Sequence, residues 1–340
     1  MKQRVAVIGA GVAGIAAALA LKQAGVEAGL YEKERLPGGH LARWHALFPG
    51  RNDAAVVLNG FLKDVEKNGV EVRTGTPITD IARVEGGFHL TTGTGEQARY
   101  DALILANGFT LFDASRKEEY GYGIYPRVIT SPDLEKRLED PETGLFINGE
   151  APRRVAFVHC VGSRDAKTGN RYCSKVCCIT GVKQAISVRE RYPECEVMNF
   201  YMDLRMFGSG YEELYQEAQE KYGINFIRGR VSEAAVTLDG SVQVKAEDTL
   251  LGCPLKVTVD WLVLLVGMEP GIPATWHETL EIERDVAGFA GSRDHFLLPG
   301  FTSAEGVFVA GACAGPATIP ESVNQGKAAA LSAIGYLKGK

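Results

Sequence analysis

The sequence predicts an α/β fold in which one Rossmann-like unit is inserted into another. Two observations support this prediction. Near the start of the chain, a short apolar segment runs directly into a glycine-rich turn and then into an alanine-rich stretch. A second apolar segment, residues 154–158, opens another unit of the same kind. The length of 340 residues agrees, because domains of roughly 100–200 residues would give two of them.

The first strand is predicted over residues 4–8, where apolar residues follow one another as in a strand buried on both faces of a parallel sheet. A G-x-G-x-x-G turn, residues 9–14, comes next, and a helix is expected to run to about residue 25. Residues 26–31 are predicted as the second strand, which Glu32 closes.

This order of elements is typical of a dinucleotide site. Gly9 permits the turn, Gly11 lets the backbone approach a pyrophosphate, and Gly14 lets the helix pack on the strand. The helix N-terminus meets the phosphates, and Glu32 accepts hydrogen bonds from ribose hydroxyls. A glycine-rich turn that binds no ligand is the less favoured alternative, because strand, turn, helix, strand and acidic residue follow in order.

The segment after Glu32 resembles the two-dinucleotide-binding flavoproteins, in which a basic residue and a glycine pair wrap the second phosphate and ribityl chain of FAD. Later segments also resemble that family, although Ala312 stands where the family has an aspartate. The last helix is expected from about Pro320 to Leu337, with its N-terminus directed at the flavin pyrimidine. The resemblance implies an FAD site formed by Gly9, Gly11, Ala13, Gly14, Glu32, Lys33, Gly38, Gly39, His40, Leu41, Ile78, Ala106, Asn107, Gly108, Gly311, Ala312 and Pro320.

The FAD segments lie at both ends of the chain, so we expect an FAD-binding domain over residues 1–110 and 297–340. Residues 111–296 would then form the inserted Rossmann-like domain. In that domain, the segment after the apolar run 154–158 lacks the glycines of a second pyrophosphate turn. The sequence therefore predicts that a nicotinamide site has been lost from the inserted domain.

Four cysteines take the place of that missing turn: Cys160, Cys173, Cys177 and Cys178. A [4Fe–4S] cluster needs four thiolates. On a regular helix Cys178 would point about 100° away from Cys177, so an irregular loop is expected there. A zinc site normally has two separated C-x₂₋₄-C pairs, and a redox disulfide normally has C-x-x-C spacing. Spacing favours the cluster and leaves these two alternatives open.

The cysteine segment resembles that of the A-type subunits of heterodisulfide reductase, from Cys160-Val161-Gly162-Ser163-Arg164-Asp165 to the adjacent pair Cys177-Cys178. The likeness continues in Tyr201-Met202-Asp203-Leu204-Arg205 and in Gly267-Met268-Glu269-Pro270. It implies FAD, one [4Fe–4S] cluster on the four cysteines, and a homodimeric subunit that works with B- and C-type subunits. The resemblance also suggests that Lys183 faces the flavin; a solvated helix lysine is the alternative. His40 is a candidate for lining the flavin, and His159 and Arg164 for hydrogen bonding to cluster sulfurs.

The chain lacks the ferredoxin-type C-x-x-C-x-x-C inserts of the methanogenic protein, and Cys195, Cys253 and Cys313 are expected to be buried core thiols. This compact form resembles the flavoprotein of heterodisulfide-reductase-like complexes of sulfur oxidisers. An electron-transfer subunit is therefore the leading hypothesis. The alternatives are the flavoprotein of a quinone-interacting oxidoreductase in sulfate reduction, an NAD(P)H-dependent disulfide reductase, and a non-catalytic assembly subunit.

Composition excludes several other classes. The chain has 37 basic and 42 acidic residues, a net charge of −5, which argues against a nucleic-acid-binding surface. No apolar run reaches the roughly 20 residues needed to span a bilayer. Glycines interrupt the apolar start, which would otherwise imitate a signal peptide. Seven cysteines are sparse for a disulfide scaffold of this size, so a cytoplasmic protein is expected.

Overall fold

The computed structural model describes residues 3–140 and 142–339. The chain divides into two compact units. Unit 1 comprises residues 1–42, 55–110 and 269–340, and unit 2 comprises residues 43–54 and 111–268. The chain passes between them four times. Two passages, at residues 42/43 and 54/55, enclose the short segment 43–54, and the other two lie within the short strands β10 (Phe109–Leu111) and β19 (Met268–Pro270).

Unit 1 is built on a parallel sheet of five strands in the order β20-β9-β1-β2-β5. Its strands are β1 (Arg4–Ile8), β2 (Glu27–Tyr31), β5 (Val72–Arg73), β9 (Ala102–Leu105) and β20 (Val307–Val309). Alternate side chains of β1 enter two different cores, because successive residues of a strand point to opposite faces. Val5 and Val7 pack with the helices α1 (Val12–Gln23) and α7 (Ile319–Lys338).

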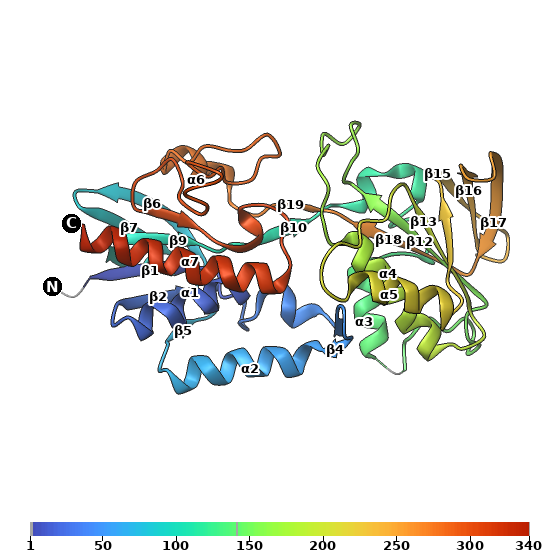
Figure 1. The fold of residues 1–340 in the computed structure, drawn as a ribbon, viewed down its shortest axis with the longest axis horizontal. Helices are drawn as coiled ribbons and strands as arrows, with labels where there is room; N and C mark the ends of the chain where they lie inside the picture. The colour runs from blue at the N-terminus through green and yellow to red at the C-terminus, as the bar shows by residue number, and fades with distance from the viewer. Residues whose placement is uncertain (1–2, 141, 340) are drawn as a thin grey trace. The chain divides into compact units, whose positions relative to one another are not determined.

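The other face of this sheet is covered by a small antiparallel sheet. Ala6 and Ile8 of β1 share a core with β6 (Ile78–Val84), β7 (Gly87–Thr92) and β8 (Gln97–Tyr100). The helix α6 (Ala274–Thr279) joins the same core through Trp276. The long helix α2 (Ala54–Lys67) precedes β5 (Figure 1). Unit 1 thus has three layers, with the parallel sheet in the middle.

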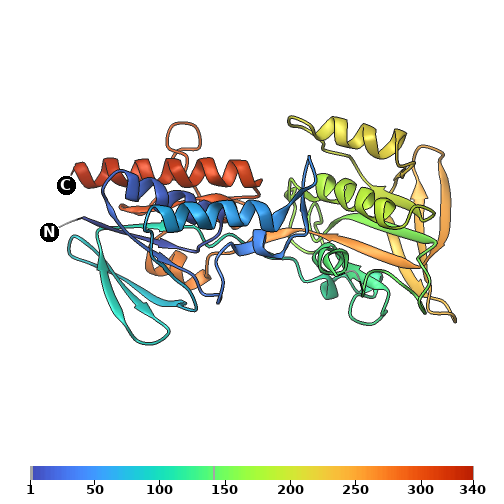
Figure 2. The same ribbon diagram turned by 90° about the horizontal axis from the view of Figure 1, so that it is seen from below.

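Unit 2 repeats this plan. Its parallel sheet has the order β11-β18-β12-β13-β14, with β11 (Val128–Thr130), β12 (Arg154–Val161), β13 (Glu196–Tyr201), β14 (Asn225–Arg228) and β18 (Trp261–Val266). One face packs against α3 (Ser131–Glu139), α4 (Cys177–Arg191) and α5 (Tyr211–Glu220). The other face packs against the antiparallel strands β15 (Val231–Val236), β16 (Val242–Asp248) and β17 (Cys253–Val259). Figure 2 shows α4 and α5 lying along the sheet.

The predicted α/β fold of two Rossmann-like units is confirmed, and so is the first strand at its predicted bounds. Some details differ. The strand predicted over residues 154–158 continues to Val161, so Cys160 lies inside β12. Residues 269–296, which the sequence placed in the inserted domain, belong to unit 1, because Trp276, Leu280 and Ile282 pack into its core. Residues 43–54, including β3 (Ala46–Leu47) and β4 (Asn52–Asp53), belong to unit 2. Among the described helices, none is long and apolar enough to cross a membrane.

Candidate functional site

In the G-x-G-x-x-G turn of unit 1, backbone segments approach each other so closely that two positions accept only glycine. Gly9 has φ +107°, and a Cβ there would lie 2.4 Å from the carbonyl oxygen of Ala106. At Gly14 a Cβ would lie 1.8 Å from the carbonyl oxygen of Gly9. At Gly11, in contrast, the nearest atom to a Cβ is the Cα of Gly39, 4.0 Å away. The second glycine therefore leaves open space at the helix N-terminus, where a phosphate can approach the backbone.

The predicted Gly38–Gly39 segment closes over this turn. Gly38 donates its N–H to the Ala10 carbonyl at 2.8 Å, and Gly11 and Gly38 form an isolated parallel bridge. Both glycines of the pair have positive φ, +117° and +57°. The following 3₁₀ helix, η1 (Gly39–Arg43), carries His40 and the buried Leu41. The two glycine segments thus meet along the backbone, as the sequence predicts for the two sides of one pyrophosphate.

Glu32 is buried at the carboxyl end of β2, where its position is fixed by the backbone. Its carboxylate accepts hydrogen bonds from the N–H of Ala10 at 2.9 Å and of Glu34 at 3.0 Å. Each carboxylate oxygen has a second lone pair, so these bonds leave acceptor capacity for ribose hydroxyls. Because one of the bonds reaches back to the glycine turn, Glu32 also braces the turn itself.

The segment after β5 runs alongside Glu32. The N–H of Thr76 donates to the Glu32 carbonyl at 2.8 Å, and the N–H of Gly75 donates to the Glu34 carbonyl at 2.7 Å.

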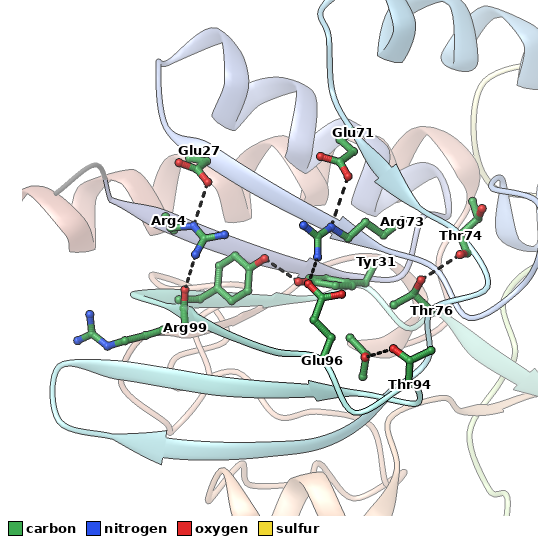
Figure 3. A network of polar contacts seen from close by, with 12 residues as sticks. Arg4, Glu27, Tyr31, Glu71, Arg73, Thr74, Thr76, Thr94, Glu96 and Arg99 are labelled. Atoms are coloured by element: carbon green, nitrogen blue, oxygen red, sulfur yellow. Dashed lines mark hydrogen bonds and ion pairs between the residues drawn. The ribbon is translucent and has the colours of Figure 1, made fainter.

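Figure 3 shows the polar network beside this segment. In it the hydroxyls of Tyr31 and Tyr100 lie 2.7 Å apart, and Arg73 pairs with Glu96 at 2.9 Å. Burial and the hydrogen bond to Tyr31 raise the pKa of Tyr100 well above its usual value, so the Tyr100 hydroxyl keeps its proton near neutrality. This network lies beside the segment that leads to Ile78, which the resemblance places in the FAD site.

The C-terminal segment completes the site in unit 1. The side-chain oxygen of Gln325 in α7 accepts a hydrogen bond from the N–H of Gly311 at 2.9 Å. Thr318 and Glu321 form a capping box at the start of α7, and Pro320 lies in its first turn. The predicted start and end of this helix are therefore confirmed. Ala312 lies in the 3₁₀ helix η4 (Gly311–Cys313), where its methyl side chain cannot make the polar contact of an aspartate.

One atom next to the glycine turn shows that the residues present fit a bound polar group. The side-chain oxygen of Asn107, which follows β9, is buried and has no hydrogen-bond partner among the described residues. A buried polar atom without a partner costs about 1–3 kcal/mol, so such atoms are expected where a ligand completes the site. His40 stacks on Phe109 at a centroid distance of 3.9 Å, and its Nε2 lies 3.0 Å from the Phe109 carbonyl oxygen. His40 is thereby held in one orientation beside the Asn107–Gly108 turn.

In unit 2 the cysteine segment begins inside a distorted strand. The register between β12 and β18 shifts between Val158 and Val161, and Cys160 within this bulge has φ +60°. Arg164 and Lys175 in the following loop also have positive φ, +54° and +62°. Non-glycine residues rarely adopt this conformation, and it concentrates at functional sites. The bulge turns the side chain of Cys160 into the core on the helical face of the sheet, where the Cys177–Cys178 pair also lies.

The structure corrects the expectation of an irregular loop at the adjacent pair. Cys177 and Cys178 are the first two residues of α4, a regular helix. They lie at its N-terminus, where unpaired N–H groups and the helix dipole stabilise thiolates. The hydrogen bond from Cys177 lowers the pKa of Cys178 to about 4, with a further lowering by His159. A hydrogen bond with Cys177 likewise lowers the pKa of Cys160 to about 7.

Cys173 stands apart from the other three. It lies in the loop before α4 and is partly exposed, and its sulfur accepts a hydrogen bond from the N–H of Lys175 at 3.3 Å. Within the described residues, no three His, Cys, Asp or Glu side chains meet at a point that would hold a single metal ion. A four-iron cluster makes a different demand, because each of its four thiolates binds a separate iron at a different corner. The four-cysteine ligand set therefore stays a prediction.

The surroundings of the cysteines fit a sulfur-rich group. Four buried side-chain atoms there have no nitrogen or oxygen hydrogen-bond partner in the described part of the chain: His159 Nδ1, Ser163 Oγ, Arg164 Nη1 and Asn199 Nδ2. The last three are donors, and His159 becomes one when protonated. Burial by itself would lower the pKa of His159, but the hydrogen bonds with Cys178 and Asn199, together with the nearby Cys178 and Cys160 thiolate charges, outweigh burial, and the pKa is raised. The inorganic and cysteine sulfurs of an iron–sulfur cluster accept hydrogen bonds from donors of this kind.

The loop is braced by a buried ion pair that the sequence did not reveal. Lys117 Nζ lies 2.7 Å from Asp165 Oδ2 and 2.6 Å from Glu119. Asp165 also accepts the N–H of Lys167 at 2.9 Å. Burial by itself would raise the pKa of Asp165, but the hydrogen bonds from Lys117 and from the Lys167 N–H, together with the charges of Lys117 and Arg230, outweigh burial, and the pKa is lowered. This pair joins the loop to the 3₁₀ helices η2 (Ala114–Arg116) and η3 (Glu118–Tyr120).

The lowered pKa predicts acid sensitivity. In the acid range the folded state binds fewer protons than the unfolded chain, so the contribution of Asp165 is full above the unfolded value of about 3.9 and is lost as pH falls further. We expect Asp165→Asn to lower the urea midpoint of unfolding near neutrality, and its difference from the native chain to shrink in acid. Urea titrations between about pH 6 and about pH 3 test this. A difference that is constant with pH would contradict the assignment.

Lys183 is buried in α4 and forms an ion pair with Glu135 of α3, which is also buried. The alternative of a solvated lysine is therefore wrong. Glu135 also accepts the N–H of His45 at 2.9 Å and the side-chain amide of Gln184 at 2.6 Å. Burial lowers the pKa of Lys183 despite the opposite effect of Glu135. The predicted role of Lys183 at the flavin stays a prediction.

Breaking this pair is expected to be costly. Lys183→Met should leave the Glu135 charge buried without its cation, which destabilises by about 3–5 kcal/mol. The double variant Lys183→Met/Glu135→Gln removes both charges, and most of the loss should be recovered. Chemical denaturation of the three proteins measures this. A single variant as stable as the native chain would show that the pair does not stabilise the fold.

With the geometry in view, comparison with known proteins assigns the family. The model of the pyridine nucleotide-disulphide oxidoreductase family matches residues 3–158 and 178–326. The chain belongs to this family. The interval that the family pattern omits, residues 159–177, begins within the last residues of β12 and contains three of the four clustered cysteines. This oxidoreductase thus departs from its family at the strand end where the second glycine turn is missing.

Its relatives match the predicted resemblance, which is confirmed. The iron-sulfur protein A 2 of the CoB–CoM heterodisulfide reductase of Methanopyrus kandleri is 34% identical, over 97% of this chain and 64% of the relative. The A-type subunit of the H(2):CoB-CoM heterodisulfide,ferredoxin reductase of Methanothermobacter thermautotrophicus is 43% identical, over 70% of this chain and 37% of the relative. The chain therefore spans less than two thirds of the length of these curated relatives.

Solved structures show the same fold. Thioredoxin reductase of T. acidophilum superimposes with a TM-score of 0.70 at 21% identity, covering 98% of both chains. Thioredoxin reductase of Lactococcus lactis gives a TM-score of 0.70 at 20% identity over the whole of both chains. The oxidoreductase thus has the α/β fold of FAD-binding Rossmann-like flavoproteins.

Sequence reasoning missed several residues of the site. Asn199 lies in no motif, and Ser163 lies in the segment that carries the resemblance but was given no role; the burial of both is a product of the fold. Glu135 lies 48 residues before its partner Lys183, and Lys117 lies 48 residues before its partner Asp165. Spacing along the chain therefore gives no sign of either ion pair.

The three remaining cysteines were predicted to be buried bystanders. This holds for Cys195 and Cys313, which are buried. It is wrong for Cys253, which is exposed at the start of β17 because that strand lies at the edge of its sheet.

Proposed function

We propose that this chain is the FAD- and [4Fe–4S]-dependent electron-transfer subunit of a heterodisulfide-reductase-like complex. The observation that carries the proposal is the cysteine segment at the carboxyl end of β12, the place where the family pattern is interrupted. When bound, FAD supplies two-electron chemistry and a [4Fe–4S] cluster supplies one-electron chemistry. With both groups bound, the chain would exchange electron pairs at one site and single electrons at the other.

The chain's own residues support both groups. In unit 1, Gly11 leaves the helix N-terminus accessible, Glu32 provides acceptors, and the side-chain oxygen of Asn107 has no partner among the described residues. In unit 2, three of the clustered cysteines lie in a dry core, and unpartnered donors of the described chain surround them. The residues that would hold the cluster are Cys160, Cys173, Cys177 and Cys178. Burial keeps water away from the sulfurs, and the α4 N-terminus favours the thiolate form that iron requires.

Partner subunits follow from the same proposal. The relatives carry the names of A-type subunits of multi-subunit reductases, so we infer that this chain also works beside B- and C-type subunits, as a homodimer in the cytoplasm. We further propose that the complex oxidises sulfur compounds, as the resemblance to the flavoprotein of heterodisulfide-reductase-like complexes of sulfur oxidisers implies. Purification of the tagged chain from its native host, followed by mass spectrometry and by assay of the complex with sulfur compounds, tests this. Recovery of the chain without partners would refute it.

The second candidate is an NAD(P)H-dependent disulfide reductase, which the family description favours. The geometry of unit 2 weighs against it. Gly162 has φ +74°, but the ring of Phe112 already fills the space where its Cβ would lie, with the nearest atom 2.0 Å away. A pyrophosphate therefore finds no open approach at this glycine. Anaerobic mixing of the flavin-loaded chain with NADH or NADPH is expected to leave the flavin absorbance unchanged, and rapid bleaching would favour the second candidate.

A further inference from the structure

A histidine and an asparagine lie on the face of the unit 2 sheet that carries the cysteines. In β12, Val155 and Phe157 point into the core shared with α4, and His159 continues on that face, because alternate side chains of a strand lie together. The bulge then adds Cys160 to the same face. On the neighbouring strand β13, Asn199 pairs in register with Phe157. His159 and Asn199 thus reach the cysteine core from two adjacent strands.

Asn199 holds the ring of His159 at one edge. The Nε2 atom of His159 lies 2.9 Å from the side-chain oxygen of Asn199. Both side chains are buried, with exposed fractions of 7% for His159 and 0% for Asn199. A carboxamide offers both donors and an acceptor, so it binds Nε2 whether or not that nitrogen carries a proton. The orientation of the ring is therefore fixed from the Nε2 side.

A glycine of α4 makes room for this ring. A Cβ at Gly181 would lie 2.9 Å from Nε2 and 3.0 Å from Cε1 of His159, and 2.5 Å from Cδ1 of Leu265 in β18. The ring thus lies closer to the helix than any larger residue at this position would allow. Gly181 follows Cys177 by one helical turn. His159 therefore packs against the turn of α4 that carries the cysteine pair.

The second ring nitrogen of His159 is left for a sulfur. Its Nδ1 atom is buried and has no nitrogen or oxygen partner among the described residues. The side chains of His159 and Cys178 are nonetheless hydrogen-bonded to each other. Because Nε2 is bound to Asn199, Nδ1 is the nitrogen that remains for the sulfur. The three side chains form a polar chain that runs from Asn199 through His159 to Cys178.

Stability alone does not account for this polar chain. The surrounding core consists of aliphatic, aromatic and cysteine side chains. Asn199 Nδ2 is buried there without a partner in the described part of the chain, and a buried donor without a partner destabilises the folded state. Apolar side chains of the same size would fill this space without that cost. The polar chain is therefore better explained by its effect on the sulfur of Cys178.

We propose that Asn199 is a positioning residue, which holds His159 so that its Nδ1–H donates to the sulfur of Cys178 and raises the reduction potential of the cluster. This inference rests on the proposed cluster. A reduced cluster carries one more negative charge than an oxidised one. A hydrogen bond to a ligand sulfur therefore stabilises the reduced form more than the oxidised form.

The test measures the midpoint potential of the cluster by an EPR-monitored redox titration of the anaerobically purified full chain with dithionite. The variants are His159→Leu, Asn199→Leu and the double variant His159→Leu/Asn199→Leu. His159→Asn is the conservative variant, because its side-chain amide keeps a donor near the position of Nδ1.

Tyr192→Phe is the matched control. The hydroxyl of Tyr192 accepts a hydrogen bond from the N–H of Leu145 at 2.8 Å. Tyr192 belongs to the same core and lies at the end of α4 opposite to the cysteine pair. The control thus loses a buried hydrogen bond of the same core without touching the polar chain, and it should change stability and leave the potential unchanged.

The potential should fall when the hydrogen bond to sulfur is lost. In His159→Leu the equilibrium constant for one-electron reduction is expected to fall on the order of tenfold, which is about 59 mV. Asn199→Leu should lower the potential in the same direction, since the ring is no longer held. The double variant should match His159→Leu alone, because Asn199 acts through the ring, and His159→Asn should stay near the native value. An unchanged potential in Asn199→Leu, or a further fall in the double variant, would overturn the positioning role.

A second measurement uses the native chain and needs no folded variant. The chain is labelled with ¹⁵N-histidine, and pulsed EPR of the reduced cluster should detect a weak coupling to a histidine nitrogen. The absence of this coupling in iron-loaded protein would contradict the hydrogen bond from His159. Iron analysis separates the two proposals. Native protein without iron would refute the cluster itself, whereas iron-loaded variants with native potentials would refute only the role of Asn199 and His159.

Discussion

Replacing Cys177 and Cys178 together by serine is expected to abolish iron binding by the purified chain. Both sulfurs lie in the first turn of α4, buried at 3% and 2% exposure, and both interact directly with a neighbouring cysteine. The hydroxyl of serine does not ionise near neutral pH and is a poor ligand for iron that normally takes thiolates. The expected result is loss of essentially all iron and of the broad visible absorbance of the cluster, with flavin retained in unit 1.

Cys195→Ser is the matched control. Cys195 is another buried cysteine of the same core, 1% exposed, and it follows α4, well away along the chain from the cysteine loop. Its sulfur donates to the backbone carbonyl of Glu196. Burial raises its pKa to about 12, the opposite of what a ligand thiolate needs. The control should lose some stability and keep its iron. Equal iron contents in the double variant and in the native chain would show that Cys177 and Cys178 are not ligands.

Two glycines of the C-terminal helix are expected to respond in opposite directions to the same substitution. Gly326 of α7 packs against α1, and a Cβ there would lie 2.1 Å from the carbonyl oxygen of Ala13. Gly335 lies in the same helix with no atom within 4 Å of its Cβ position. Gly326→Ala must therefore push α7 away from α1, at a cost of about 1–3 kcal/mol or more. Gly335→Ala should stabilise by about 0.5–1 kcal/mol, because alanine favours the helix.

The Gly326 substitution also reports on the cofactor site. Ala13 lies in the first turn of α1, and Gln325, the neighbour of Gly326, holds the N–H of Gly311. Separation of the two helices should therefore weaken FAD binding by Gly326→Ala, and Gly335→Ala should leave it unchanged. Thermal unfolding and flavin titration of both variants measure the two effects. Similar stability and flavin affinity in the two variants would contradict the close packing of α1 on α7.

The elements of unit 1 could be predicted well from the sequence, because the information there is local. The strand Arg4–Ile8, the glycine turn and Glu32 follow one another within 29 residues, and each contributes to the tight turn between β1 and α1. The start of α7 was also predictable, since Pro320 marks a first helical turn. Such signals depend on a few neighbouring residues, and tertiary packing has little freedom to override them.

The predicted element bounds were wrong where contacts between residues far apart in the sequence determine the local structure. The bulge in β12 extends the strand through Cys160, and the start of α4 at Cys177 reflects the burial of that helix on the sheet. Residues 43–54 belong to unit 2, where the N–H of His45 donates to the distant Glu135. Neither effect is visible in the spacing of the cysteines. The spacing indicated the chemistry, and the fold determined which side chains surround it.

The cofactor content of the chain after strictly anaerobic purification decides whether the cysteine segment binds an iron–sulfur cluster. Flavin, iron and acid-labile sulfide are measured per chain, together with EPR spectra of the dithionite-reduced protein. We expect one FAD and about four irons with about four sulfides, and a reduced-cluster EPR signal that disappears in the Cys177→Ser/Cys178→Ser variant. Protein that retains its flavin and contains no iron would contradict the assignment of the cysteine segment to an iron–sulfur cluster.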